Sequence, residues 1–193
     1  MVTAEELWNP DKTRVTILFD PGRIKRGVQP NLQLGLPLIE GYTYKLVIDE
    51  NWLDVNDVKL TEGFEKIFDV ITVDRESPSF KNWRIDFPNI KNKSSIKIDF
   101  KEAMDFGLLH SAIVIVDETN GYVNGVIELS ENESEWTFTP KKNWLKGNYK
   151  MIINAWLEDL SGNNLNRKFD INLNSENDTP KNIEEVIIPF EIN

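Results

Sequence analysis

The amino-acid sequence predicts an all-β protein. Apolar residues alternate with polar ones along most of the chain, which is the pattern of strands with one buried face. Turn-forming segments such as TNG, ENES and SGNN separate these runs at intervals of about ten residues, a spacing typical of a β-sandwich or barrel. The composition, 40% hydrophobic and 28% charged over 193 residues, is that of a globular protein.

The expected strands follow one another along the whole chain. In the N-terminal part, LFDP (residues 18–21) ends one strand and another begins at Gly41. Further along, alternating runs predict strands at residues 83–87, 96–100, 136–138 and 169–173. Two runs richer in apolar residues are expected to be central strands covered on both faces, residues 113–116 and 150–156. Residues 186–192 form the last expected strand, in which Pro189 suits the edge of a sheet.

One segment between these strands has a helical pattern. In KEAMDFGLLHSA (residues 101–112), Asp105 can cap a helical turn whose apolar residues Leu108, Leu109 and Ala112 lie at helical spacing. Gly107 keeps this turn short. The single histidine, His110, lies in the turn and is expected to be a solvated surface residue, because it has no evident catalytic partner nearby.

The chain contains an internal repeat. The segment from Gly41 to Lys66 aligns with the segment from Gly147 to Ile171, and in this alignment Tyr44 matches Tyr149, Asp54 matches Asp159 and Leu60 matches Leu165. Upstream, LFDP matches TFTP (residues 137–140) as a strand that ends in proline. Six residues then separate Pro140 from Gly147, but nineteen separate Pro21 from Gly41. Residues 22–40 are therefore expected to be a loop insertion between two paired strands.

The earlier copy lacks the opening strands of the later one. Residues 83–135 carry a strand pattern ahead of the second copy's WTFTP, but only a short segment precedes ILFDP. Half a sandwich cannot bury both sheets, so its apolar face must be covered by the second unit, by another chain or by upstream sequence. We expect a partial unit at residues 1–74, a linker at 75–82, a complete β-sandwich at 83–175, and a polar linker with a terminal edge strand at 176–193.

These motifs together resemble the bacterial Ig-like domain, which occurs in tandem in secreted, periplasmic and surface proteins. The resemblance covers about residues 83–173 and rests on IKIDFKEAMD, IVIVDETNGYVNGVIEL, WTFTPKKNWLKGNYKMIINAWLEDLSGNNL and FDINL. It implies an Ig-like β-sandwich that is secreted, periplasmic or on the cell surface, and it transfers no catalytic residues. The first unit resembles the second half of a preceding domain. Residues 1–6 have neither the basic start nor the apolar stretch of a signal peptide.

Composition and charge disfavour several classes of partner. With 32 acidic and 22 basic residues, the formal net charge of -10 repels phosphate backbones and anionic membranes, so neither nucleic-acid binding nor membrane insertion is expected. No apolar run reaches the roughly 20 residues of a membrane helix. Without cysteine the chain has no disulfides, thiolate nucleophiles or cysteine-bound zinc, and one histidine excludes a site with two imidazoles.

The six tryptophans are candidates for ligand contact. A carbohydrate-binding β-sandwich uses exposed aromatic side chains as a platform for sugar rings. Trp83 and Trp136 are in phase with apolar strand positions, which favours core packing. Trp52 and Trp144 lie next to turns and are the better platform candidates.

The acidic corner LEDLSGNN (residues 157–164) supplies the oxygen ligands that calcium prefers, with Asp159 and Asn163 as the metal candidates. Its spacing is not that of an EF-hand, and aspartate and asparagine also form turns by bonding their own backbone. Because Asp54 occupies the matching place in the first copy, a corner held by a carboxylate explains both copies without an ion. We expect no cofactor, with calcium as the alternative.

A basic cluster in the loop insertion consists of Arg23, Lys25 and Arg26. It is not expected to be a phosphate loop, because the glycine spacing does not match the known types and no helix pattern follows. The cluster can bind a carboxylate or phosphate of a partner, for which arginine is well suited. Pairing with acids of the same chain is the favoured interpretation, because such acids are abundant.

No catalytic constellation is evident. Strand acids such as Asp86, Asp99 and Asp170 alternate with core residues and are expected to face solvent, and Ser111 lies on a different face of the helical turn from His110. We therefore expect a non-enzymatic structural or adhesive module whose partners are other domains or chains of the same protein, or a cell-surface protein or glycan. The alternative is a ligand-binding module, for carbohydrate, that uses exposed aromatic residues.

Overall fold

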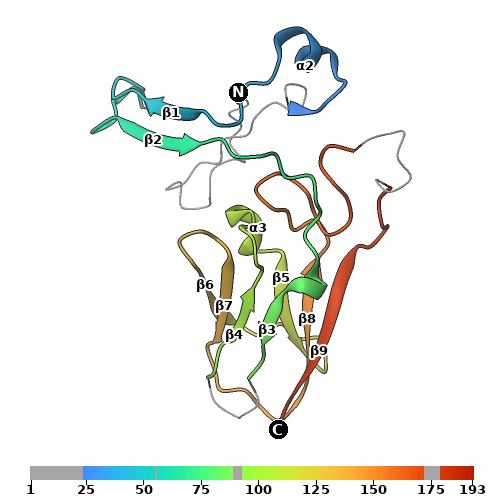
Figure 1. The fold of residues 1–193 in the computed structure, drawn as a ribbon. Helices are drawn as coiled ribbons and strands as arrows, with labels where there is room; N and C mark the ends of the chain where they lie inside the picture. The colour runs from blue at the N-terminus through green and yellow to red at the C-terminus, as the bar shows by residue number, and fades with distance from the viewer. Residues whose placement is uncertain (1–23, 55, 89–92, 172–178) are drawn as a thin grey trace. The chain divides into compact units, whose positions relative to one another are not determined.

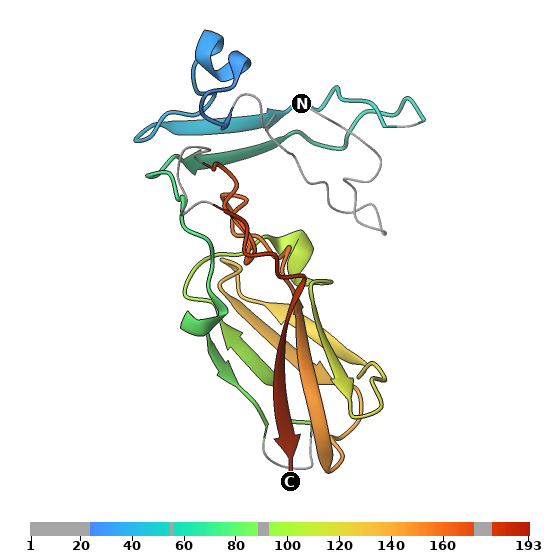
Figure 2. The ribbon, with the colours of Figure 1, turned by 90° about the vertical axis from the view of Figure 1, so that its right-hand side faces the viewer.

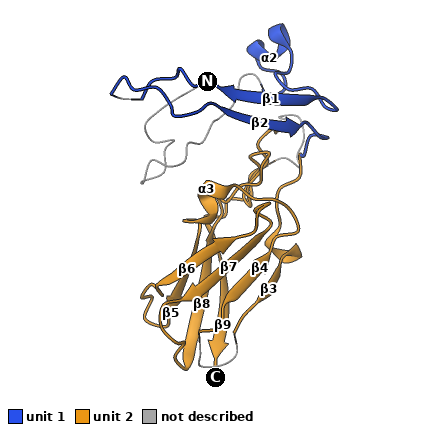
Figure 3. Ribbon diagram, turned by 90° about the vertical axis from the view of Figure 1, so that its left-hand side faces the viewer, with its two compact units in different colours: residues 1–74 blue, residues 75–193 orange. Residues whose placement is uncertain are grey.

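The structure is a computed structural model, and it describes residues 24–54, 56–88, 93–171 and 179–193. The chain divides into two compact units, residues 1–74 and residues 75–193 (Figure 3). Almost all of the regular structure is β, which confirms the predicted fold class. The segment 18–21, expected to end a strand, lies outside the described residues.

The second unit is a sandwich of two antiparallel sheets (Figures 1 and 2). One sheet has the strand order β3-β4-β7-β6, with the bounds Arg84–Asp86 for β3, Ile96–Asp99 for β4, Glu135–Pro140 for β7 and Gly125–Leu129 for β6. The other has the order β5-β8-β9, with the bounds Ile113–Asp117, Gly147–Asn154 and Glu185–Ile192.

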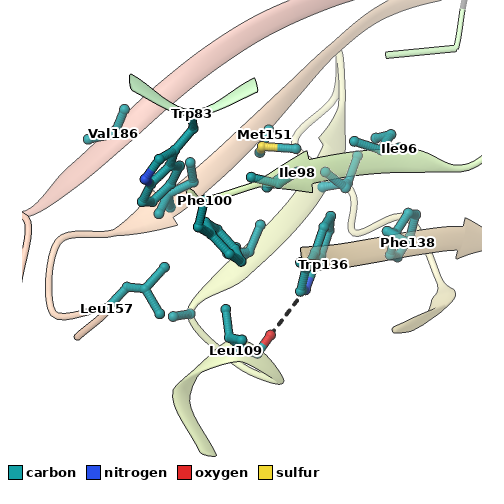
Figure 4. Packing of buried hydrophobic residues seen from close by; sticks show 14 of the residues in the cluster. Trp83, Ile96, Ile98, Phe100, Leu109, Trp136, Phe138, Met151, Leu157 and Val186 are labelled. Carbon is teal, nitrogen blue, oxygen red and sulfur yellow. Dashed lines mark hydrogen bonds between the residues drawn. The ribbon is translucent and has the colours of Figure 1, made fainter. Parts of the chain in front are cut away.

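The core of this unit lies between the two sheets (Figure 4). Ile98 of β4, Trp136 of β7 and Met151 of β8 are each 1% exposed or less. Burying a large apolar side chain stabilises the fold by about 1.5–3 kcal/mol. Burial of the alternating apolar side chains is therefore the main contribution to the stability of this unit. The indole Nε1 of Trp136 donates a hydrogen bond to the carbonyl oxygen of Leu109 at 3.1 Å, which satisfies its polar atom inside the core.

Most of the expected strands are present. The predictions for residues 83–87, 96–100, 136–138 and 186–192 are confirmed by β3, β4, β7 and β9, and Pro189 lies on the edge strand β9. The central position expected for residues 150–156 is confirmed, because β8 lies between β5 and β9, but residues 113–116 are not central and the expectation that both runs are covered on both faces was wrong. Burial alternates along β8, and β5 is the last strand of its sheet among the described strands.

The strand expected at residues 169–173 does not begin where predicted. Residues 169 and 170 form a bend and residue 171 has no regular structure, because the backbone N–H of Phe169 donates to the side-chain oxygen Oδ1 of Asn163 at 3.0 Å and joins no sheet ladder. Residues 172 and 173 lie outside the described part of the chain.

Short helices complete the second unit. Helix α3 (Phe106–Leu109) follows Asp105, whose Oδ1 accepts a hydrogen bond from the N–H of Leu108 at 2.8 Å, and the predicted helical turn is confirmed. A 3₁₀ helix, η2 (Phe80–Asn82), lies in the segment expected to be a linker.

The first unit contains an antiparallel pair of strands, β1 (Thr43–Ile48) and β2 (Phe64–Asp69), and a helix, α2 (Gln29–Leu34). Helix α2 lies in the expected loop insertion, so the expectation that no helix follows the basic cluster was wrong. Pro30 in the first turn presets the helical backbone angle, and Gly35 ends the helix at φ 71°. No residue of 24–54 or 56–74 is buried.

Each unit contains a corner closed by an aspartate. In the first unit, Oδ1 of Asp54 accepts hydrogen bonds from the backbone N–H of Asn56 at 2.7 Å and of Val58 at 3.0 Å. The N–H of Asp54 donates to the carbonyl oxygen of Val58 at 2.8 Å, and Asp57 has a positive φ of 60°. The side chain therefore bonds its own backbone two and four residues ahead.

The corner of the second unit repeats this pattern at the aligned positions. Oδ1 of Asp159 accepts from the N–H of Ser161 at 2.7 Å and of Asn163 at 3.0 Å. The N–H of Asp159 donates to the carbonyl oxygen of Asn163 at 2.9 Å, and Gly162 has a φ of 80°. The two segments thus share not only sequence but also the same three hydrogen bonds around the corner.

Candidate functional site

One of the two predicted platform tryptophans is exposed and the other is buried. Trp52 in the first unit is 49% exposed, as a platform requires. Trp144 is only 2% exposed, because its ring packs against Tyr149 and Phe190 and its Nε1 donates to the carbonyl oxygen of Ser94 at 2.7 Å. The prediction that Trp144 offers a ligand platform was therefore wrong.

A third tryptophan, Trp156, is the most exposed of those in the described part of the chain, at 57%. It was missed because residues 150–156 were interpreted as a strand covered on both faces. The alternation of core-facing and outward-facing positions along this segment could have predicted that Trp156 is exposed. Met151, Ile153, Ala155 and Leu157 are buried, so Trp156 falls out of phase with the core and points outward.

Trp156 has an arginine against its ring. The Cζ atom of Arg167 lies 5.5 Å from the ring centroid, within the range of a cation–π contact. The backbone N–H of Arg167 donates to Oδ1 of Asn164 at 2.8 Å, so the residue is tied to the acidic corner. This contact fixes a charged group beside the exposed ring.

The ring borders a hollow of about 550 Å³, here named the Trp156 groove. It lies where β8 ends and β9 begins, at the end of this sheet opposite the C-terminus (Figure 1). Among the residues that line it are Asn154, Trp156, Asn166, Asn182, Glu184 and Glu185. All of them belong to the second unit.

Three chain segments that form the groove are joined by hydrogen bonds. Oδ1 of Asn154 accepts from the N–H of Trp156 at 2.9 Å, and Oδ1 of Asn166 accepts from the N–H of Ile183 at 3.2 Å. The N–H of Ala155 donates to the carbonyl oxygen of Glu184 at 2.9 Å. The walls are therefore held in place by the fold.

The metal candidates Asp159 and Asn163 are buried, at 4% and 1% exposed. Oδ2 of Asp159 accepts from Nδ2 of Asn163 at 2.9 Å, in addition to the two backbone bonds to Oδ1. Oδ1 of Asn163 accepts from the N–H of Phe169. Every side-chain oxygen of the pair thus accepts a hydrogen bond, and the carboxylate closes the turn.

Glu158, which belongs to the acidic corner, has a pKa above its ordinary value. Burial raises the pKa of Glu158, and the charges of Asp105 and Asp159 act in the same direction. The hydrogen bond from Asn164 and the charge of Arg167 oppose this rise. The protonated form of Glu158 is therefore favoured by the fold.

The basic cluster belongs to the first unit, and the strand acids belong to the second. Arg23 lies outside these residues, Lys25 is half-buried and Arg26 is exposed, and the role of the cluster stays a prediction. Asp86 is exposed and Asp99 pairs with Lys101. The side chain of Asp170 is only 16% exposed and lies 3.7 Å from Nε of Arg75, so the expectation that it faces solvent was wrong.

The second unit is a two-sheet antiparallel sandwich with a tyrosine that anchors the chain. The hydroxyl of Tyr149 in β8 accepts from the N–H of Leu145 at 3.2 Å and donates to its carbonyl oxygen at 3.1 Å, a tie to the upstream backbone seen in immunoglobulin-type sandwiches. These features define an Ig-like β-sandwich.

Residues 86–174 match the family model of the bacterial Ig-like domain, and this part of the chain is such a domain, as the resemblance implied. No curated protein matches the chain.

Proposed function

We propose that the protein is a non-enzymatic structural or adhesive module of a bacterial secreted or envelope protein, in which two Ig-like units follow one another. Domains of this family are generally non-enzymatic and occur in surface or secreted bacterial proteins. No helix in the described part of the chain has the length and apolar character needed to cross a lipid bilayer.

The observation that carries this proposal is the corner that recurs at Asp54 and Asp159. The same two side-chain bonds, the same backbone bond and the same positive φ occur at aligned positions of the two units. A tyrosine tie recurs as well, because the hydroxyl of Tyr44 accepts from the N–H of Ile39 at 2.9 Å. These matches support the assignment of residues 41–69 as the second half of an Ig-like unit, and a repeated unit suits spacing or presentation.

The first unit carries the apolar residues of such a half without burying them. Trp52 is 49% exposed where its counterpart Leu157 is fully buried, and Leu60 is 38% exposed where Leu165 is 1% exposed. Exposed apolar surface of this kind marks a contact surface. This difference supports other domains or chains of the same protein as the partners of the first unit.

The perturbed carboxylates support a structural role. The pKa of Asp54 is lowered by backbone hydrogen bonds from Val58 and Asn56, and the pKa of Asp117 is lowered by hydrogen bonds from Thr119 and Gly121. Both carboxylates close turns within a few residues of their own position. In the described part of the chain, the hydrogen bonds that lower these two pKa values are the bonds that close the turns.

The location can be tested on intact cells of the source bacterium. Cells that produce the protein are treated with a membrane-impermeant biotin reagent, and the culture medium and a periplasmic extract are analysed alongside. We expect the protein to be labelled on intact cells or recovered from the medium or the extract, while a cytosolic enzyme stays unlabelled. Recovery of the protein with the cytosolic enzyme alone would overturn the proposal.

A further inference from the structure

We propose that the Trp156 groove binds a neutral carbohydrate. This site goes beyond the structural role proposed above and does not depend on it, because the groove lies wholly within the Ig-like sandwich of the second unit.

Trp156 provides the platform. Its side chain is 57% exposed although Arg167 lies against the ring, so a large part of the indole surface is open to solvent. An aromatic face of this size packs against the C–H groups of a pyranose ring, which is the way protein aromatics meet amphipathic ligands. A single exposed tryptophan is common on protein surfaces, so the argument depends on the polar groups around it.

Two asparagine amides beside the platform are oriented as hydrogen-bond donors. The oxygens of Asn154 and Asn166 each accept a backbone N–H, and this fixes the orientation of the two amide planes. The NH₂ group of each amide makes no hydrogen bond with another described residue, and each carries two N–H donors. These donors remain available to a ligand in the groove.

The acceptors come from the other side of the groove. Glu184 and Glu185 are exposed at the start of β9, and the carbonyl oxygen of Glu184 is held by the N–H of Ala155. Neither carboxylate forms an ion pair with a described residue. Sugar hydroxyls both donate and accept, so a groove that pairs amide donors with carboxylate acceptors around an aromatic face matches them.

The charges in and near the groove select the class of ligand. Glu184, Glu185 and the net charge of -10 disfavour an acidic sugar. Arg167 beside the Trp156 ring disfavours a cationic ligand, because the two positive charges would compete for one aromatic ring. A neutral sugar avoids both penalties.

The groove is also preorganised. Hydrogen bonds join residues 154–156, 166 and 183–184, so the platform and the donors are positioned before a ligand arrives. Binding to a preformed site avoids the entropy cost of ordering loops.

The test uses the full chain on an array of immobilised oligosaccharides. The neutral probes are oligomers of glucose, mannose, galactose, xylose and N-acetylglucosamine, and sialylated and sulfated glycans are included. We expect binding to at least one neutral oligomer. By calorimetry, Trp156→Ala should weaken that binding by about tenfold or more, as expected for a central aromatic contact, and Trp156→Phe by less.

Tyr122→Ala is the matched control, because Tyr122 is an aromatic side chain of the second unit that is 74% exposed and does not line the groove, so its removal should leave sugar binding unchanged. The melting temperature of Trp156→Ala is measured in parallel and should stay close to that of the wild type. The proposal is overturned if no neutral oligomer binds, if only acidic glycans bind, or if Trp156→Ala and Tyr122→Ala have equal effects.

Discussion

At the scale of single residues, two aspartates make the same bonds in different environments. Asp54 and Asp159 each accept two backbone N–H groups on Oδ1, but Asp159 is 4% exposed and Asp54 is exposed to solvent. A hydrogen bond to a buried charged group contributes more to stability than one that water can replace. The two corners therefore offer a matched pair for measuring what burial adds.

We predict that Asp159→Asn destabilises the protein by about 1–3 kcal/mol. The new amide nitrogen would face Nδ2 of Asn163, which now donates to Oδ2 of Asp159. Asn163 cannot rotate its amide to relieve this contact without losing the bond from Phe169. Urea unfolding of the full chain, followed by far-ultraviolet circular dichroism, measures the change.

Asp54→Asn is the control for this prediction. Oδ1 of Asp54 takes both corner bonds in the described structure, and an asparagine retains that oxygen. The unfolding midpoint of Asp54→Asn should therefore fall by much less than that of Asp159→Asn, since only the charge of an exposed carboxylate is lost. Equal effects of the two substitutions would contradict the role given to burial.

The candidate site could be predicted from the sequence only in part. The residue type was right, since an exposed aromatic side chain borders the groove, but Trp144 was named and Trp156 was not. Proximity to a turn suggested exposure for Trp144, whereas its position lets the ring enter the core. The groove also requires residues 166 and 182–185, and their approach to Trp156 depends on the pairing of β9 with β8.

At the scale of elements, β9 completes the sandwich from the far end of the chain. It pairs with β8 along its whole length, from Asn154 opposite Glu185 to Gly147 opposite Ile192. Val186 and Ile192 are 8% and 0% exposed, whereas Ile187 is 50% exposed. The family match ends at residue 174, so the strand that covers this edge lies beyond the matched segment.

We predict that Val186→Asp destabilises the protein by several kcal/mol, because it places an unpaired charge in the core. Ile187→Asp, on the adjacent outward position, should shift the melting temperature by only a few degrees. Differential scanning calorimetry of the two variants makes the comparison. Similar melting temperatures for the two variants would show that β9 does not belong to the core of the sandwich.

Strands and the capped helical turn were predictable because their signals are local. Alternation located β3, β4 and β7, an apolar run located β9, and Asp105 marked the start of α3. Helix α2 was missed, since six residues starting at Gln29 form too short a window for helical periodicity. The assignment of β5 to the end of its sheet depends on long-range pairing, which no local pattern contains.

At the scale of the whole molecule, the pH dependence of stability has two opposing parts. One part comes from aspartates whose pKa is lowered, and the other comes from Glu158, whose pKa is raised. Hydrogen bonds lower the pKa of Asp49, Asp54, Asp99 and Asp117 from the ordinary value of 3.8. Their stabilising contribution is present above that value and is lost as the pH falls through the lowered pKa values. Glu158 has a raised pKa, so its contribution is complete below the ordinary value of 4.5 and is lost as the pH rises through the raised pKa.

We predict that Glu158→Gln stabilises the protein at pH 7 and leaves its stability nearly unchanged at pH 4. Glutamine resembles the protonated carboxyl group that the fold favours, and its side-chain oxygen can keep the bond from Nδ2 of Asn164. At pH 7 the variant avoids the cost of a partly buried negative charge between Asp105 and Asp159. The free energy of unfolding in urea at the two pH values measures the difference.

Glu128→Gln separates this local effect from that of overall charge. Glu128 is exposed on β6, and its substitution changes the net charge of -10 by the same amount. If desolvation of Glu158 causes the effect, the gain at pH 7 must be larger for Glu158→Gln than for Glu128→Gln, and high salt must not abolish it, because salt screens exposed charges far more than buried ones. Equal gains that disappear together in salt would place the cause in the net charge of the molecule.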